Sequence, residues 1–225
     1  MCSYYPESKV EISGFTARHY DKLLDIASLG TYSSMIKEAV RLMRIEPADR
    51  ILDLGAGTGR NARLMARYLS QKGEIIGLDI SDEMIAQFEK NCAHFPNIRI
   101  VNTRVDQDLS FETCFDKVFI SFVLHGFPQE ARSRIIGNAC RALKKGGSFF
   151  VLDYNEFSMD EMPLYSRVPF KILECPYAFD FIEKDWKKIL SLQGFDNFRE
   201  HLFFLGYVRL LQGKKSSDDC AAIPE

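Results

Sequence analysis

The chain has 225 residues, of which 46% are hydrophobic, and its formal net charge is −2. A chain of this length can form a substantial hydrophobic core, and its near-neutral charge does not indicate a basic surface that binds nucleic acid. The sequence shows no run long and apolar enough to span a membrane and no signal peptide, and its six cysteines include no Cys-x-x-Cys pair. We therefore expect a cytoplasmic domain without a metal ion; peripheral contact with a membrane stays open.

Residues 16–44 have apolar side chains at helical spacing. The spacing predicts one helix that ends near Gly30 and a second that ends before Pro47. Because this pair precedes the first predicted strand, we expect residues 1–45 to form a helical cap over a ligand cleft.

From residue 50 onward, apolar runs of strand length alternate with helical stretches. The predicted strands are 50–54, 74–79, 98–102, 116–121 and 148–153, and the predicted helices between them include 60–70, 82–93 and 129–143. Alternation of this kind is typical of a mainly parallel sheet with helices on both faces, which is a doubly wound α/β fold.

After residue 153 the pattern changes. The remaining predicted elements are helices at 156–167 and 181–192 and strands at about 197–203 and 206–212. Since no helix separates these last strands, they should pair antiparallel. We expect one domain in which residues 46–213 form the sheet core and 214–225 form a flexible tail.

Residues 53–59 read Asp-Leu-Gly-Ala-Gly-Thr-Gly, directly after the apolar pair Ile51-Leu52. This pattern predicts a strand that turns sharply against a ligand, because glycine permits backbone angles and close approaches that a side chain blocks. The following helix would direct its N-terminal amides toward the same ligand. A dinucleotide fingerprint, Gly-x-Gly-x-x-Gly, would require glycine where Arg60 stands, which disfavours a nicotinamide oxidoreductase.

The glycine spacing resembles motif I of the class I S-adenosylmethionine-dependent methyltransferases. Further segments resemble later motifs of that family in the same order: Glu74 to Asp79, Phe115 to Ser121, and Leu143 to Asp153. The resemblance covers about residues 50–155. It implies a Rossmann-like, seven-stranded sheet that ends in an antiparallel hairpin, with S-adenosyl-L-methionine as the cofactor.

The resemblance also implies which residues bind that cofactor. The loop of Gly55, Ala56, Gly57 and Gly59 would lie against its methionine portion. Asp53 would order this turn or reach the cofactor's amino group through water.

At the second strand, Asp79 would accept hydrogen bonds from both ribose hydroxyls, since a carboxylate suits a diol. Ile80 and Met84 would enclose the adenine, with a core position as the alternative for Met84. Val105 and Asp106 follow the third strand, where the family often has an acid that binds the adenine amino group; a solvated loop is the alternative for Asp106. Ser121 would face the cofactor's methionine end.

Two local stretches resemble the ubiquinone/menaquinone-biosynthesis C-methyltransferases and their small-molecule relatives. One is Ala17-Arg18-His19-Tyr20-Asp21, and the other is Phe122-Val123-Leu124-His125-Gly126-Phe127. In those relatives the tyrosine lies over the cofactor, so Tyr20 is an expected contact. Many of them read Leu-His-His where this chain has Leu124-His125-Gly126, so a second histidine is missing here.

Two residues are candidates for acid–base chemistry. His125 follows the fourth predicted strand, at the edge where open α/β sheets bind ligands, and it could take a proton from the acceptor or be a structural histidine bonded to a carbonyl. Asp153 ends the fifth strand and could be a base, an orienting hydrogen-bond acceptor or a helix cap. The many aromatic residues after 157 suit a planar, apolar acceptor.

We therefore expect methyl transfer from S-adenosylmethionine to a small molecule, such as a quinol-like or other planar ring compound. The alternative is a non-catalytic cofactor-binding subunit that regulates or scaffolds a partner, which an acceptor cleft filled by the protein's own side chains would favour. A protein or RNA methyltransferase is disfavoured by the lack of a basic face and of an Asn-Pro-Pro-Tyr-type motif.

Overall fold

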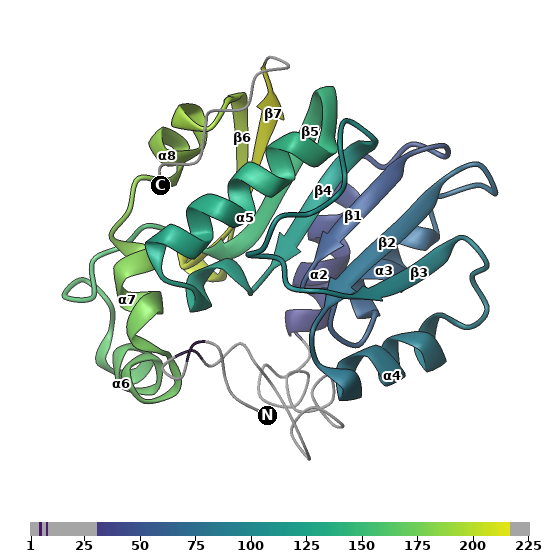
Figure 1. Ribbon diagram of the computed structural model, residues 1–225. Helices are drawn as coiled ribbons and strands as arrows, with labels where there is room; N and C mark the ends of the chain where they lie inside the picture. The colour runs from purple at the N-terminus through teal and green to yellow at the C-terminus, as the bar shows by residue number, and fades with distance from the viewer. Residues whose placement is uncertain (1–4, 6–7, 9–30, 217–225) are drawn as a thin grey trace.

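The computed structural model describes Tyr5, Ser8 and residues 31–216. In that part of the chain, seven strands form one sheet in the order β3-β2-β1-β4-β5-β7-β6 (Figure 1). The strands are β1 Arg50–Leu54, β2 Glu74–Asp79, β3 Ile98–Asn102, β4 Phe115–Ser121, β5 Leu143–Tyr154, β6 Phe195–Phe203 and β7 Val208–Lys215. Strands β1 to β5 pair in parallel, whereas β7 lies antiparallel between β5 and β6. The predicted mainly parallel, seven-stranded sheet is confirmed.

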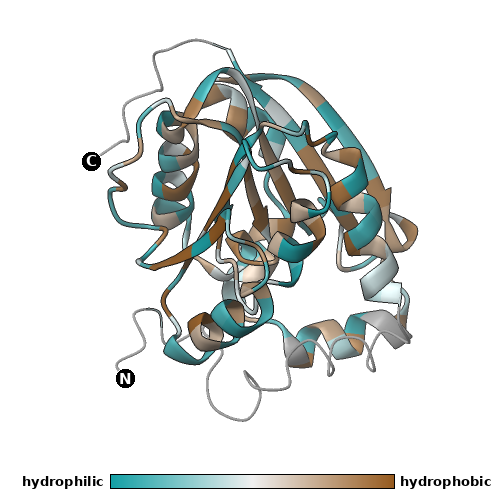
Figure 2. Ribbon diagram, turned by 90° about the vertical axis from the view of Figure 1, so that its right-hand side faces the viewer, coloured by the Kyte–Doolittle hydropathy of each residue, from teal (hydrophilic) through white to brown (hydrophobic). Residues whose placement is uncertain are grey.

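Helices cover both faces of this sheet. They are α2 Thr31–Leu42, α3 Arg60–Ala66, α4 Asp82–Cys92, α5 Gln129–Ala142, α6 Leu164–Leu173, α7 Pro176–Ile182 and α8 Trp186–Leu192, with short 3₁₀ turns η1 Leu124–Gly126 and η2 Phe204–Gly206. One buried cluster joins α2, α3 and α4 to the sheet, and a second joins α5, α7 and α8 to the opposite face. The central strands β1, β2 and β4 are largely hydrophobic and buried because both of their faces are covered, whereas the edge strand β6 is largely exposed; Figure 2 shows hydrophobic and hydrophilic strand segments in the sheet.

Strand β1 shows how the sequence divides between the two clusters. Ile51 belongs to the cluster with α2, α3 and α4, whereas Leu52 and Leu54 belong to the cluster with α5, α7 and α8. Side chains alternate between the faces of a strand, so Asp53 shares the face of Ile51. The strand therefore delivers a carboxyl group to the α3 side of the sheet at its carboxyl end.

Several predicted boundaries differ from the structure in the second half of the chain. The predicted helix 156–167 is wrong, because α6 begins only after Pro163. The predicted helix 181–192 is two helices, since Pro176 begins α7 and Asp185 caps α8 by accepting a hydrogen bond from the Lys188 amide at 2.9 Å.

The predicted ends of one more helix and of the last strand also differ from the structure. The predicted helix 60–70 ends at Ala66. The predicted tail from 214 overlaps β7, which runs to Lys215 because that side chain is buried and its ammonium donates to the Leu143 carbonyl at 2.9 Å.

The first predicted helix, and with it Tyr20, lies outside the described residues. Of the predicted cap, only α2 is described, and its Ile36, Ala39 and Val40 are buried against the α3 side of the sheet. Among the helices of the described part, none combines the length and the apolar character needed to cross a membrane.

Candidate cofactor and acceptor site

The glycine loop closes over the end of β2. The amides of Gly55 and Ala56 both donate to the Leu78 carbonyl at 2.9 Å, which ties the loop between the carboxyl ends of β1 and β2. Gly55, Gly57 and Gly59 all have positive φ angles, of 73°, 53° and 79°. Only glycine adopts these φ angles without strain, so the backbone geometry is by itself a sufficient reason for all three glycines.

Their surroundings differ. A Cβ atom added to Gly55 would lie 2.6 Å from Val123, and one added to Gly59 would lie 2.8 Å from Cys92, so these two glycines are required by packing. A Cβ atom added to Gly57 would have no described neighbour within 4 Å. Gly57 therefore presents bare backbone at the place where the resemblance expects the cofactor.

The Asp79 carboxylate is bound to this loop. One oxygen accepts from the Gly57 amide at 2.8 Å, and the other accepts from the Ser81 amide at 3.0 Å. Burial raises the pKa of Asp79 above its ordinary value, although these amides favour the ionised form. A carboxylate has about four acceptor positions, so capacity for a ligand hydroxyl remains beside the amides of Gly57, Ser81 and Ile80.

Asp53 and Ser121 carry buried polar atoms without a described hydrogen-bond partner, Asp53 Oδ2 and Ser121 Oγ. They lie on adjacent strands, and because Asp53 pairs with Phe119 in the parallel register, Asp53 and Ser121 point to the same face. Unsatisfied buried groups cost free energy unless a ligand supplies the partner. This pair beside the open Gly57 backbone fits the polar, positively charged end of S-adenosylmethionine.

The ionisation of the Asp53 carboxyl group would change when a cation binds beside it. Its side chain is buried, and burial together with the negative charge of Asp79 raises its pKa to about 7. Near neutral pH the carboxyl is thus close to half ionised, and a bound positive charge would favour the carboxylate.

We expect Asp53→Asn to stabilise the cofactor-free protein and to weaken cofactor binding. The folded-state pKa of Asp53 lies above its unfolded value, so the wild-type protein loses stability as the pH rises from about 4 to about 7. The asparagine variant should lack this loss. Its free energy of unfolding at pH 8 should therefore exceed that of wild type by up to about 4 kcal/mol. Thermal melting between about pH 4 and pH 8, with and without S-adenosylhomocysteine, checks both signs. A variant less stable than wild type without cofactor would contradict the account.

The predicted adenine residues lie around the same end of the sheet. Met84 and Val105 are buried, and Ile80 is half-buried at the end of β2. The Met84 amide begins α4 by donating to the Ser81 hydroxyl at 3.4 Å. Their contact with adenine stays a prediction.

Asp106 is not a solvated loop carboxylate. It is only 2% exposed, and it accepts from the Arg104 guanidinium at 2.6 and 3.0 Å and from the Tyr5 hydroxyl at 2.6 Å. Burial alone would raise the pKa of Asp106, but these donors outweigh it and hold the pKa below its ordinary value. A role for Asp106 with adenine stays a prediction, and its carboxylate would have to accept from adenine in addition to Arg104 and Tyr5.

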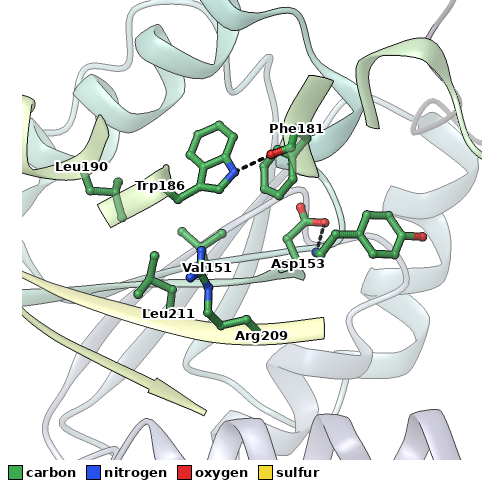
Figure 3. A pocket seen from close by; sticks show the side chains of 8 residues that line it. Val151, Asp153, Phe181, Trp186, Leu190, Arg209 and Leu211 are labelled. Carbon is green, nitrogen blue, oxygen red and sulfur yellow. Dashed lines mark hydrogen bonds between the residues drawn. The ribbon is translucent and has the colours of Figure 1, made fainter. Parts of the chain in front are cut away.

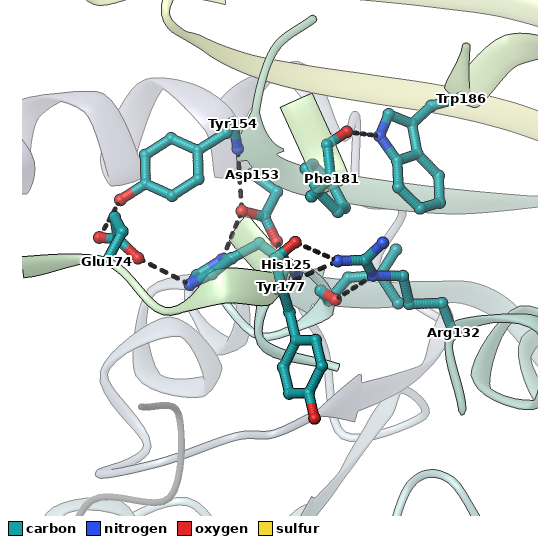
Figure 4. Close-up of polar contacts among 9 residues, drawn as sticks. His125, Arg132, Asp153, Tyr154, Glu174, Tyr177, Phe181 and Trp186 are labelled. Atoms are coloured by element: carbon teal, nitrogen blue, oxygen red, sulfur yellow. Dashed lines mark hydrogen bonds and ion pairs between the residues drawn. The ribbon is translucent and has the colours of Figure 1, made fainter. Parts of the chain in front are cut away.

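His125 and Asp153 meet at the ends of β4 and β5 (Figure 4). The His125 Nδ1 atom lies 2.7 Å from Asp153 Oδ1, and the His125 amide donates to Asp153 Oδ2 at 3.2 Å. The Tyr154 amide also donates to this carboxylate, at 2.8 Å. Asp153 therefore orients the imidazole with a proton on Nδ1. It does not cap a helix that follows it in the sequence, since the next described helix, α6, begins at Leu164.

The other side of the imidazole faces a second carboxylate. The His125 Nε2 atom lies 3.6 Å from Glu174 Oε2, and Glu174 Oε1 accepts from the Tyr154 hydroxyl at 2.6 Å. Burial lowers the pKa of His125, but the charges of Asp153 and Glu174 and the hydrogen bond to Asp153 outweigh it, so the pKa lies above its ordinary value. Arg132 opposes this rise. His125 is thus not the carbonyl-bonded histidine that the sequence left open.

Arg132 holds the backbone around His125. Its side chain is completely buried in α5, where the guanidinium donates to the carbonyls of Leu124, His125 and Tyr177 at 3.2, 3.1 and 2.5 Å and pairs with Asp180 at 2.6 Å. Figure 4 shows it beside the Phe181 and Trp186 rings. The arginine therefore joins the turn after β4 to α7.

Asp153 also lines a small cavity (Figure 3). Its walls include Val151, Phe181, Trp186 and Arg209, and its volume is about 10 Å³. That volume holds one water molecule at most. An acceptor ring cannot enter there.

Sequence reasoning missed two members of this cluster. Arg132 carried a usable signal, because it occupies an inward position of α5, on the same helical face as Ile135, Ile136 and Ala139. Glu174 carried none, since it follows α6 in a stretch broken by prolines and only the folded chain brings it to His125.

Comparison with known proteins agrees with this geometry. Residues 51–147 match a family model described as a methyltransferase domain. The ubiquinone/menaquinone biosynthesis C-methyltransferase UbiE of Xanthomonas campestris pv. campestris is 29% identical over 175 residues, covering 72% of this chain and 65% of the relative. The demethylmenaquinone methyltransferase of Staphylococcus carnosus is 26% identical over 219 residues, covering 89% and 90%. The chain thus spans about two thirds of the length of the first relative and most of the second.

The fold is shared with solved structures. A putative methyltransferase in complex with the Haloferax volcanii Trm112 methyltransferase activator has a TM-score of 0.67 at 15% identity, covering 92% of this chain and all of that chain. The CurJ carbon methyltransferase has a TM-score of 0.60 at 18% identity, covering 77% and 50%. With the glycine loop, the Asp79 contacts and the strand order, these comparisons show a chain that is similar to the class I S-adenosylmethionine-dependent methyltransferases in its methyltransferase-domain match and in its fold.

Proposed function

We propose that the protein transfers a methyl group from S-adenosylmethionine to a small, planar acceptor that carries a ring hydroxyl, such as a quinol. The observation that supports this most directly is the adjacency of two sites. Asp53, Ser121 and Gly57 form a place for a polar cation, and the aromatic cluster around His125 begins one residue after Ser121. The names of the two relatives, which refer to quinone biosynthesis, favour a quinol-type ring.

On the cofactor side, Asp79 would hold the ribose, and Gly55, Ala56, Gly57 and Gly59 would lie along the methionine portion. Asp53 and Ser121 would provide its polar partners, Ile80, Met84, Val105 and Asp106 would surround the adenine, and Tyr20 would add a contact from the N-terminal region. When bound, S-adenosylmethionine supplies a methyl group on a positively charged sulfur.

On the acceptor side, aromatic rings make a wall beside the loop. The Tyr154 ring lies 5.0 Å from His125, 5.0 Å from Phe170 and 6.1 Å from Phe122. Flat rings in such a cluster favour a planar, apolar ligand, and the polar edges of His125 and Tyr154 add hydrogen-bonding groups for a hydroxyl. This combination supports a hydroxylated aromatic acceptor over a charged aliphatic one.

We assign acid–base chemistry to His125 and Asp153. Asp153 fixes the proton on Nδ1, so in the neutral imidazole Nε2 has the lone pair that can take a proton. The Asp153 carboxylate then stabilises the imidazolium that forms.

Binding and turnover test the proposal together. S-adenosylhomocysteine should bind in calorimetry, and Asp79→Ala should weaken it by about 1–3 kcal/mol because two hydroxyls lose a charged acceptor. Asp82→Ala is the matched control, since Asp82 is exposed at the start of α4 and accepts from the Asn102 side chain instead. Binding of NADH without binding of S-adenosylhomocysteine would contradict the assignment.

The acceptor is tested with a panel of hydroquinones and S-adenosylmethionine, read by mass spectrometry for the gain of one methyl group. Cofactor binding without methylation of any panel member would favour the alternative function, a cofactor-binding subunit that regulates or scaffolds a partner.

A further inference from the structure

Glu174 connects the buried His125–Asp153 pair with the acceptor side. It follows α6, and its amide donates to the Phe170 carbonyl at 2.9 Å, which fixes its backbone at the helix end. Its two carboxylate oxygens face different partners, the Tyr154 hydroxyl at 2.6 Å and His125 Nε2 at 3.6 Å. Each carboxylate oxygen accepts more than one hydrogen bond, so a ligand hydroxyl can share the carboxylate with partners from the protein.

The solvent exposure of the three acid–base side chains increases from Asp153 through His125 to Glu174. The side chain of Asp153 is 2% exposed, that of His125 is 9% exposed, and that of Glu174 is 18% exposed. The cavity that Asp153 lines has a volume of about 10 Å³, which is too small for a ring. An acceptor that approaches this cluster therefore meets Glu174 before it meets the imidazole.

Glu174 also lies toward the cofactor loop. Its partner Tyr154 packs on Phe122, and the next residue, Val123, is the side chain that a Cβ atom on Gly55 would strike. Tyr154 and Phe122 therefore connect Glu174 to the turn after β4, whose Val123 packs on the glycine loop.

We propose that Glu174 is a catalytic residue that binds the acceptor's ring hydroxyl and passes its proton to His125. This inference rests on the proposed function. The hydroxyl O–H bond breaks, the proton moves to the Glu174 carboxylate, and the electron pair stays on the ring oxygen, where it increases the electron density of the ring. Glu174 then gives the proton to His125 Nε2 and becomes a carboxylate again, while Asp153 balances the imidazolium charge.

The distance of 3.6 Å from Glu174 Oε2 to His125 Nε2 is longer than a hydrogen bond, and catalytic hydrogen bonds often tighten only when substrate is present. His125 must be neutral to receive the proton. The charged groups that face it are Asp153, Glu174 and Arg132, and turnover should rise with pH as the imidazolium is lost.

The test compares wild type with Glu174→Gln, Glu174→Asp and the control Glu161→Gln, an exposed acid before α6. The first measurement is calorimetric binding of a hydroquinone and of its dimethyl ether to protein saturated with S-adenosylhomocysteine, so that no turnover is needed. Wild type and Glu161→Gln should prefer the hydroquinone, and Glu174→Gln should lose about tenfold of this preference, because a charge-assisted hydrogen bond becomes a neutral one.

The second measurement is kcat against pH. Glu174→Gln should lower kcat by about 10²-fold or more and Glu174→Asp should restore part of it, with melting temperatures close to wild type. A Glu174→Gln variant that keeps both the hydroxyl preference and the kcat of wild type overturns the inference. Failure of the proposed function is distinguishable, because wild type would then methylate no hydroquinone at all.

Discussion

Asp153→Asn should lower kcat by about 10²–10⁴-fold while cofactor affinity stays near the wild-type value. The asparagine amide can donate a hydrogen bond to His125 Nδ1, which the carboxylate cannot. The imidazole would then carry its proton on Nε2, and the atom that faces Glu174 could no longer accept one. Steady-state kinetics with saturating S-adenosylmethionine checks the loss, and calorimetry with S-adenosylhomocysteine checks that the cofactor site is intact.

The pH dependence separates this chemical role from a merely structural one. The folded-state pKa of His125 lies above its unfolded value of about 6.5, so the pair contributes stability that is present below about pH 6.5 and is lost as the pH rises through the folded value. Activity should rise over the same pH range. In Asp153→Asn the loss of stability and the rise of activity with pH should both occur at lower pH than in wild type. Turnover near the parent rate for both His125→Ala and Asp153→Asn would show that positioning alone is sufficient.

Arg132→Met should have the largest effect on stability, a loss of about 3–5 kcal/mol. Methionine keeps much of the apolar volume between Phe181 and Trp186, but it leaves the carbonyls of Leu124, His125 and Tyr177 without their shared donor. For a domain of this size, such a loss lowers the melting temperature by about 6–20 °C. Because the His125 carbonyl is one of the three, turnover per folded molecule should fall as well.

Arg141→Met is the matched control for that substitution. Arg141 lies on the same helix, but its side chain is 33% exposed and its acidic partner Asp108 is almost fully exposed. Arg141 also donates to Asn138 Oδ1 at 2.5 Å, and an exposed pair and one such hydrogen bond each contribute about 1 kcal/mol, so this variant should lose much less stability than Arg132→Met. Equal losses for the two arginines would show that the buried guanidinium has no special structural role.

How far the sequence predicts this protein depends on the range of the interactions involved. The five parallel strands follow from local apolar runs, and the loop from Asp53 to Gly59 follows from backbone angles that only glycine adopts freely. The acceptor side is different. Where α6 begins depends on Pro163 and on packing of Phe170 against the neighbouring aromatic rings, and Glu174, one of the two acidic partners of His125, is 49 residues away. Asp153 was found because it ends a strand, whereas Glu174 has no local pattern that would distinguish it from a surface acid.

The position of β7 has a consequence for how the chain folds during synthesis. This strand is made from residues 208–215, yet it lies inside the sheet, where it pairs with β5 from Ser148 to Tyr154 and with β6 on its other side. Until those residues leave the ribosome, β5 is an open edge beside Tyr154 and the acceptor site, and open edges pair readily with other chains. The final step of folding therefore joins segments about 60 residues apart, which makes it slow compared with the pairing of β1 with β2, whose partners are 24 residues apart. Nascent chains that stop before residue 208 should require a chaperone, whereas complete chains should not.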